Sequence, residues 1–245
     1  MSSGVWGMEW QVALGRPRLF AWNVAVPLML LVPVALSEAA LPHRAVVFTV
    51  FFGFFAVFGS CIPVIRDATS GWIETVSLTG CAPRRAWAER IAAAATLDLA
   101  QLAPVGLVLL WASAGWTWAG AVLAGLALAL LAGAAIGTLV AAAVRSLAEG
   151  ALASAAVTLF LLHLAGVFRA PVAPWAVSAA RWSPFRPLHQ ALIGLSSGRT
   201  GPAEGLAGGL PDVGPALLTT AFLIGLFLLA APAIDRRLRW PLTRS

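Results

Sequence analysis

The sequence predicts an all-α integral membrane protein with six transmembrane helices, and its composition and hydropathy pattern both lead to this fold class. Hydrophobic residues make up 60% of the 245 residues, charged residues make up only 11%, and the mean hydropathy is +0.88. A soluble domain carries about 25% charged residues. The polar residues are too few to form a water-facing surface around this apolar content. Six apolar stretches approach the roughly 20 residues that a helix needs to cross about 30 Å of hydrocarbon.

The six predicted spans lie within a single domain, residues 1–245. They are 19–36, 45–65, 91–112, 116–144, 150–168 and 215–234. Backbone polar groups inside lipid need partners within their own segment, so each stretch is predicted to be helical. Small residues recur at every fourth position of the fourth span: Gly125, Ala129, Gly133, Gly137 and Ala141. This spacing predicts close packing against another helix.

The arginine distribution predicts the orientation. Each of the 16 basic residues is an arginine, and 11 of them lie in the termini and loops on one side of the predicted spans. Basic residues accumulate on the cytoplasmic side of membrane proteins. We therefore expect a multi-pass protein of the plasma membrane with both termini in the cytoplasm. The same bias accounts for the net charge of +6 without a nucleic-acid partner.

The absence of lysine excludes several kinds of chemistry. A P-loop needs the lysine of G-x-x-x-x-G-K-[ST], so the chain cannot hydrolyse ATP by that route. A lysine Schiff base is excluded as well. The two cysteines provide no disulfide framework, and the three histidines have no cysteine placed to complete a metal site. We expect a non-catalytic chain without a metal or cofactor of its own.

Three segments lie outside the predicted spans. Residues 4–15 place Trp6 and Trp10 at helical spacing, which is typical of a helix lying in the membrane interface. Residues 66–90 form the most charged loop, which is predicted to be cytoplasmic. Residues 169–214 form a long outer segment rich in Pro and Gly. Its first half is predicted to contain short extracellular helices, and its tail, 194–214, is predicted to be flexible.

The charged loop carries the main candidate site, whose residues are Arg66, Asp67, Gly71, Trp72, Ile73, Glu74, Leu78 and Gly80. Thr69 or Ser70 is predicted to cap a short helix that has Glu74 in its first turn. Trp72 and Ile73 belong to no predicted span. Apolar residues rimmed by charge are typical of a docking surface. We therefore expect this helix to insert into a groove of a partner protein, with Trp72 and Ile73 as apolar anchors.

The loop resembles the cytoplasmic coupling segment of type-2 ABC exporter permeases. In that family a basic–acidic pair precedes a Gly-x-x-Glu element, and a Lys or Arg follows later. Here the matching residues are Arg66-Asp67, Gly71, Glu74 and Arg90. Gly80 stands where the family has a proline, and Pro83 comes later than that position. Two further runs are similar to the family's extracellular element and to its start, namely Pro184-Phe185 with Pro187, and Gly15-Arg16-Pro17.

The resemblance implies the permease subunit of an ATP-driven exporter. Such a subunit pairs with a second permease copy and with two ATPase subunits, which bind ATP and Mg²⁺. The coupling loop then transmits closure of the ATPase pair to the spans as a rigid-body shift. Few charges lie within the predicted spans. We therefore expect an apolar or amphipathic cargo, such as a lipid, a drug, an antibiotic or a peptide.

Asp98, Gln101 and His163 form the candidate polar site within the spans. A carboxylate in lipid is costly and is often functional. We favour a structural role, in which Asp98 hydrogen-bonds to Gln101 or to a neighbouring helix and His163 is a hydrogen-bonded packing residue deep in the fifth span. Two other classes of protein stay open. One is a secondary transporter or channel without an ATPase partner, and the other is an intramembrane enzyme.

Overall fold

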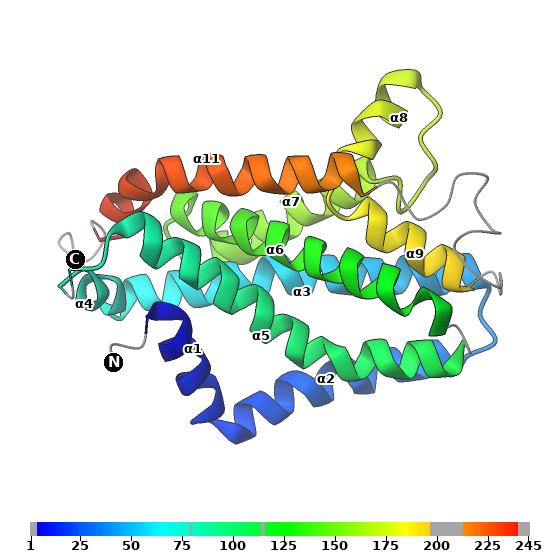
Figure 1. Cartoon of the computed structure of the whole chain (residues 1–245), viewed down its shortest axis with the longest axis horizontal. Coiled ribbons are helices and arrows are strands. Elements are labelled where there is room, and N and C mark those ends of the chain that lie inside the picture. The colour runs from blue at the N-terminus through cyan, green and yellow to red at the C-terminus, as the bar shows by residue number, and fades with distance from the viewer. Residues whose placement is uncertain (1–3, 79, 114–115, 197–212, 240–245) are drawn as a thin grey trace.

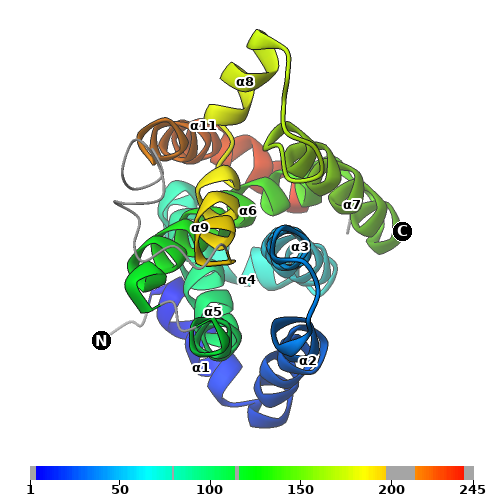
Figure 2. The ribbon, with the colours of Figure 1, turned by 90° about the vertical axis from the view of Figure 1, so that its right-hand side faces the viewer.

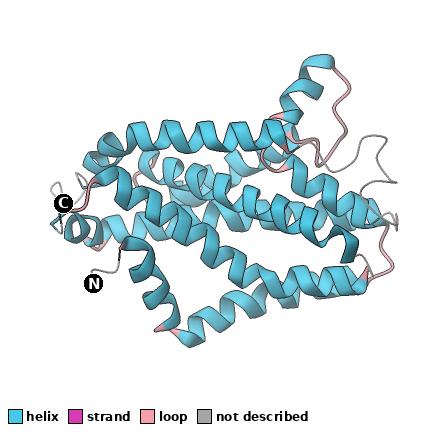
Figure 3. Ribbon diagram, viewed as in Figure 1, coloured by secondary structure: helices cyan, strands magenta, loops and turns pink. Residues whose placement is uncertain are grey.

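The computed structural model describes residues 4–78, 80–113, 116–196 and 213–239, and helices are the only regular elements in these ranges (Figures 1 and 3). Six helices are long and apolar enough to cross a membrane. They are α2 (Pro17–Leu36), α3 (Leu41–Thr69), α5 (Pro83–Ala112), α6 (Ala119–Ala143, preceded by the 3-10 turn η1, Trp116–Trp118), α7 (Leu147–Leu164) and α11 (Gly214–Arg239). They indicate a multi-pass membrane protein.

Each predicted span corresponds to one of these helices, but several helices extend beyond the apolar stretch. Helix α3 begins before and ends after the predicted 45–65, and α5 begins well before the predicted residue 91. These extensions carry polar and charged residues, which a search for apolar stretches leaves out. Proline occupies the first turn of α2, α3 and α5, where a missing backbone N–H costs little. Ser146 starts α7 by accepting a hydrogen bond from the backbone N–H of Glu149.

The long helices run roughly side by side, and α3 and α6 form the centre of the bundle (Figures 1 and 2). Helix α3 packs against α6, α7 and the short helix α9 (Arg186–Ser196). Helix α11 packs against α6 and α5. Helix α2 packs mainly against α5 and lies at the edge of the bundle. As a result, α2 presents much of its apolar surface outward.

The predicted small-residue face of α6 is a close-packing face. A Cβ atom at Gly133 would clash with Ala56 of α3, and one at Gly137 would clash with the carbonyl oxygen of Val57. At Gly125 an added Cβ would lie 2.8 Å from the backbone of Leu188. The face therefore receives two neighbours, α3 and α9, whereas the sequence indicated only that some helix approaches it.

The short helices α1 (Val5–Leu14) and α4 (Trp72–Leu78) lie at one end of the bundle, together with the last turn of α11 (Figure 1). We call this the α4 end. Helices α8 (Pro174–Arg181) and α9 lie at the opposite end, the α9 end. Helix α8 projects away from the bundle, whereas α9 packs into it. Helix α8 lies in the first half of the segment, where the sequence predicted short helices, and α9 begins there and extends into the start of the predicted tail.

The Pro184–Pro187 element turns the chain into α9 and is part of the core. Pro184 and Pro187 are buried, and Phe185 is fully buried. His189, which the sequence analysis placed in an outer loop, is buried in α9 with its Nδ1 atom 3.0 Å from Oγ1 of Thr49. The Thr49 hydroxyl donates to the carbonyl oxygen of Ala45 at 2.7 Å, so the histidine is the donor in its contact with Thr49. The predicted flexible tail 194–214 falls mainly outside the described residues, but its start is not flexible, because residues 194–196 form the last turn of α9 and Leu195 is buried.

Candidate functional site

Two glycines with left-handed backbone conformations set the position of α4. Gly71 has φ +76° between α3 and α4, and Gly80 has φ +74° between α4 and α5. A side chain at either position would meet no atom within 4 Å. Glycine is therefore favoured by the backbone conformation, which other residues adopt only with strain. Gly80, which stands where the resembled family has a proline, is the second of these joints.

The predicted cap of α4 differs in the structure. Thr69 and Ser70 belong to the end of α3, where their hydroxyl groups donate to the carbonyl oxygens of Arg66 and Asp67. They satisfy carbonyl groups of the preceding helix because α3 continues beyond its apolar stretch. Ser70, the C-cap residue of α3, and Gly71 connect the two helices, and Glu74 lies in the first turn of α4 as expected.

Arg90 connects four elements at the α4 end. Its guanidinium group pairs with Asp67 at the end of α3 and with Glu9 of α1, the latter at 3.3 Å. It also lies 4.6 Å from the centre of the Trp72 ring of α4, in a cation–π arrangement. Arg90 itself is buried in α5. We call Glu9, Asp67, Trp72 and Arg90 the Arg90 cluster.

The Arg90 cluster holds a buried cation and two partly buried carboxylates that depend on one another. Burial raises the pKa of Glu9, and the positive charge of Arg90 acts in the opposite direction. Asp67 is shared with Arg66, whose Nε lies 3.5 Å from an oxygen of the Asp67 carboxylate. Removing one partner from such a group leaves an uncompensated buried charge, which is strongly destabilising. The cluster therefore connects α1, α3, α4 and the start of α5.

The apolar side chains of α4 mainly face the protein. Ile73 and Val76 are buried, and the Trp72 ring is half-buried against Arg90. This corrects the expectation that Trp72 and Ile73 are exposed anchors, because both contribute to holding α4 on the bundle. Leu78 instead is 87% exposed, and Glu74 is exposed as well. The outward face of α4 thus carries Glu74 and Leu78.

A second basic group lies beside α4. Arg145, Arg236 and Arg237 line a groove of about 740 Å³ between the ends of α3, α6 and α11. Arg237 donates to the carbonyl oxygen of Ala143 at 3.3 Å, which connects α11 to the end of α6. The basic residues that the sequence analysis assigned to one side therefore include a group gathered at the α4 end.

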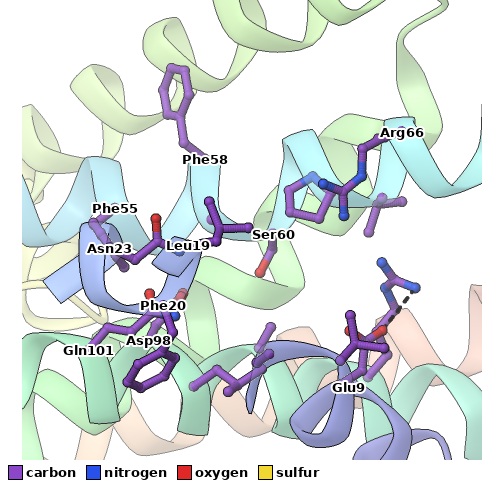
Figure 4. Close-up of a pocket in the computed structure, with 18 of the residues that line it drawn as sticks. Glu9, Leu19, Phe20, Asn23, Phe55, Phe58, Ser60, Arg66, Asp98 and Gln101 are labelled. Atoms are coloured by element: carbon purple, nitrogen blue, oxygen red, sulfur yellow. Dashed lines mark ion pairs between the residues drawn. The ribbon is translucent and has the colours of Figure 1, made fainter. Parts of the chain in front are cut away.

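A cavity of about 430 Å³ begins at the Arg90 cluster and extends along α5 between α2 and α3 (Figure 4). Residues from α5 line it at helical spacing, namely Arg90, Ala94, Leu97, Asp98 and Gln101. Helix α1 contributes Glu9, and α2 contributes Phe20 and Asn23. The cavity therefore connects the charged α4 end with the polar residues in the middle of the bundle.

Asp98 faces this cavity without a hydrogen-bond partner on its Oδ2 atom. The side chain is only 7% exposed. Gln101 lines the same cavity, but the described residues show no hydrogen bond between it and Asp98, so the expected pairing is not formed. His163 lies elsewhere, exposed in the last turn of α7. The three predicted residues are therefore not one site, and His163 is not deep in its helix because α7 ends at Leu164.

Several residues of this region escaped the sequence analysis. Glu9 lies in a segment interpreted only as interfacial, and Ser60, Phe55 and Phe58 lie in an apolar stretch. The one local signal was Asn23, a polar residue that interrupts the first span. Nothing in the linear order shows that these residues meet Asp98.

No protein-family model matches the chain, and no curated protein matches it. Its class is therefore defined by its own structure, a bundle with six helices long and apolar enough to cross a membrane. Within that class, the Arg90 cluster and the adjoining cavity are the features on which a function can be argued.

Proposed function

We propose that the chain is the membrane-spanning permease subunit of an ATP-driven ABC exporter of the type-2 class. The observation that carries this proposal is α4, a short helix between two long ones, held by glycine joints and by the Arg90 cluster. It bears Glu74 and Leu78 on an outward face at the end of the molecule. The resemblance of Arg66-Asp67, Gly71, Glu74 and Arg90 to a coupling segment adds to this support.

The packing of α4 suggests how a push on it is transmitted. Ile73 and Val76 fix the helix on the bundle, and Trp72 contacts the guanidinium group that holds Asp67 and Glu9. A displacement of α4 therefore moves the end of α3, the start of α5 and α1 together. Such a rigid-body shift is a common form of switching transition. On this proposal α1 is the interfacial helix, and α8 and α9 are the extracellular helices.

The proposal assigns ATP hydrolysis to a partner. A pair of ATPase subunits binds ATP and Mg²⁺ and docks on α4, and a second permease copy completes the pathway. Exposed apolar residues on α2, α7 and α11 provide surface for lipid and for that second copy. On this proposal the α4 end with its arginine group lies in the cytoplasm together with both termini, and the membrane is the plasma membrane. The cargo is apolar or amphipathic.

The test first establishes whether a reading frame beside this gene encodes a P-loop ATPase, and then co-expresses that ATPase with the full chain. We expect the two to co-purify and the reconstituted complex to hydrolyse ATP, whereas the chain alone does not. Glu74→Ala and Leu78→Ala should weaken association about tenfold or more, the scale of a lost interface contact of 1.4 kcal/mol. Val172→Ala, an exposed residue at the α9 end, is the matched control. Wild-type association and ATP hydrolysis in both α4 variants would contradict the docking role.

A secondary transporter or channel is the second candidate, and Asp98 is the observation that favours it. A buried carboxylate that faces a cavity is typical of proton- or ion-coupled pathways. This candidate predicts uptake or efflux in proteoliposomes that is driven by an ion gradient without ATPase. Gradient-driven transport by the chain alone would replace the exporter proposal.

A further inference from the structure

We propose that the cavity between α1, α2, α3 and α5 binds the protonated amine of an amphipathic molecule, with the Asp98 carboxylate as its counter-ion. The ligand class is an organic ammonium ion attached to an aromatic or aliphatic body. Neither the resemblance nor the predicted coupling segment identifies such a site.

The first support is the carboxylate itself. Asp98 lines the cavity, and its Oδ2 atom is buried without a hydrogen-bond partner in the described residues. An ionised carboxylate out of water is costly unless it is paired with a cation. The buried cation on the same helix face, Arg90, lies about two helical turns away. It already contacts Asp67 and Glu9.

The second support is the set of polar groups that line the cavity around Asp98. Oγ of Ser60 on α3 is also buried, lines the cavity and has no partner. Gln101 and Asn23 present amide groups to the same space (Figure 4). An ammonium group has several N–H donors and no acceptor. The Asp98 carboxylate, the Ser60 hydroxyl and the amide oxygens supply the acceptors that such a group needs.

The third support is the size and the apolar wall of the cavity. Its volume of about 430 Å³ lies within the roughly 300–1,000 Å³ range of small-molecule sites. Phe20 of α2 and Phe55 and Phe58 of α3 are among the lining residues, and the ring of Phe58 points away from Asp98 (Figure 4). Aromatic rings attract cations through their faces and also accommodate an apolar body. The combination of rings and one carboxylate fits an amphipathic amine better than it fits a bare metal ion.

Gly59 gives the carboxylate its space. A Cβ atom at this position would lie 2.9 Å from Oδ2 of Asp98. A methyl group there would occupy the space that an ammonium group needs beside the oxygen. On α5, Gly106 offers a matched position, because a Cβ there would meet nothing within 4 Å.

The other charged residues that line the cavity do not remove its preference for a cationic ligand. Arg66 and Arg90 both pair with Asp67, and Arg90 also pairs with Glu9. Arg16 is exposed at the outer edge, where water screens its charge. Asp98 is therefore the buried carboxyl group of the cavity that has no cationic partner in the described residues. If the bound amine is also the exported cargo, that further role rests on the permease proposal, whereas binding itself does not.

The experiment measures binding to the purified full chain in lipid nanodiscs, without any ATPase. The probes are tritiated 1-naphthylmethylammonium and its neutral analogue 1-naphthylmethanol, which share the ring and differ in charge. We expect the wild-type chain to bind the ammonium probe at least about tenfold more tightly. Equal affinity for the two probes in the wild-type chain would overturn the proposal.

Four variants locate the site. Asp98→Asn keeps the side-chain shape and should abolish the preference for the ammonium probe. Gly59→Ala should weaken its binding, whereas Gly106→Ala should not. Ser60→Ala should weaken it by a smaller factor, whereas Ser154→Ala, a buried serine of α7 outside the cavity, should have no effect.

The outcomes separate this proposal from the exporter. Retention of the ammonium preference in both Asp98→Asn and Gly59→Ala would overturn the site. Loss of the preference in these two variants, with the Gly106 and Ser154 controls unchanged, would establish it. That result would stand even if no ATPase associates with the chain. Conversely, a functional ATPase complex with no ammonium preference would leave the exporter proposal in place and remove this one.

Discussion

Arg90 and Asp98 lie on one face of α5 and line the same cavity, yet their surroundings differ. Arg90 is paired from three neighbouring elements, by Asp67, Glu9 and the ring of Trp72. Asp98 retains an unpartnered oxygen. A buried charge that has oppositely charged partners holds elements together, whereas one that lacks a charged partner is available to a ligand or a proton. This difference separates the structural charge from the candidate binding charge.

His189 provides a residue-level prediction. Burial, with a further contribution from the charge of Arg186, lowers its pKa to about 4. In the unfolded chain a histidine titrates near pH 6.5, so below that pH the unfolded state binds a proton that the folded state excludes. Protonation of the unfolded chain at His189 therefore costs no stability above about pH 6.5. As the pH decreases from there toward 4, it lowers the free energy of unfolding by about 1.4 kcal/mol per pH unit at most.

Thermal unfolding of the purified chain between pH 8 and pH 5 measures this loss. The substitution His189→Asn places an amide near the Nδ1 position, where it can still donate to Thr49, and it carries no titrating group. We expect this variant to lose less stability on acidification than the wild type. His43→Asn, at an exposed histidine, is the control and should leave the slope unchanged. An equal loss of stability per pH unit in the wild type and in His189→Asn would show that His189 does not cause the loss on acidification.

At the scale of elements, α6 determines how closely the central helices approach. Gly133 and Gly137 allow the backbone of α3 to contact α6 directly. Small residues at such contacts are typical of membrane helices, whose association depends on van der Waals packing. Helix α4 is held differently, by two glycine joints and by buried apolar side chains. The α3–α6 interface is therefore fixed by the close fit of small residues, whereas the position of α4 is fixed by backbone conformation and by buried apolar side chains.

Gly137→Ala tests the α3–α6 contact. The added methyl group would clash with the carbonyl oxygen of Val57, so the helices must separate. We expect a loss of about 1–3 kcal/mol, the usual cost of overpacking, measured by denaturant or thermal unfolding in detergent. Gly120→Ala on the same helix is the control, because its Cβ would meet no atom within 4 Å. Equal stability of Gly137→Ala and the wild type would contradict the close approach.

For the whole molecule, the distribution of charge follows the long axis. The Arg90 cluster and the groove lined by Arg145, Arg236 and Arg237 lie at the α4 end. The α9 end carries the projecting helix α8 and the packed helix α9. If the bundle spans a bilayer, these two ends lie on opposite sides of it. The arginine excess then predicts that the α4 end is cytoplasmic.

Cysteine labelling tests this orientation. In a Cys81→Ser background, where the remaining Cys61 is buried, Leu78→Cys and Val172→Cys introduce thiols at residues that are 87% and 82% exposed. A membrane-impermeant maleimide should label the Val172→Cys protein in intact cells. It should label the Leu78→Cys protein only in inside-out vesicles. The background variant alone is the control. Labelling of both positions from one side would contradict the transmembrane arrangement.

The sequence by itself determined the class of fold and the approximate position of each long helix. Hydropathy is a local property, and lipid leaves backbone groups no partners outside their own helix. The length of an apolar stretch is therefore sufficient to locate a membrane-spanning helix. The sequence also located the short helix that has Glu74 in its first turn, and the small-residue face of α6. It missed the extensions of α3 and α5, because their polar ends do not contribute to an apolar stretch.

Only the tertiary structure decided which residues meet. In membrane helices the lipid-facing and protein-facing sides are both apolar, so the sequence carries little periodic signal for helix rotation. For this reason the pairing of Glu9 and Asp67 with Arg90, the inward face of Ile73 and the burial of His189 could not be predicted. The separation of His163 from Asp98 has the same origin. The cavity exists because α1, α2, α3 and α5 place distant residues around one space, which depends on packing between helices rather than on the sequence of any one of them.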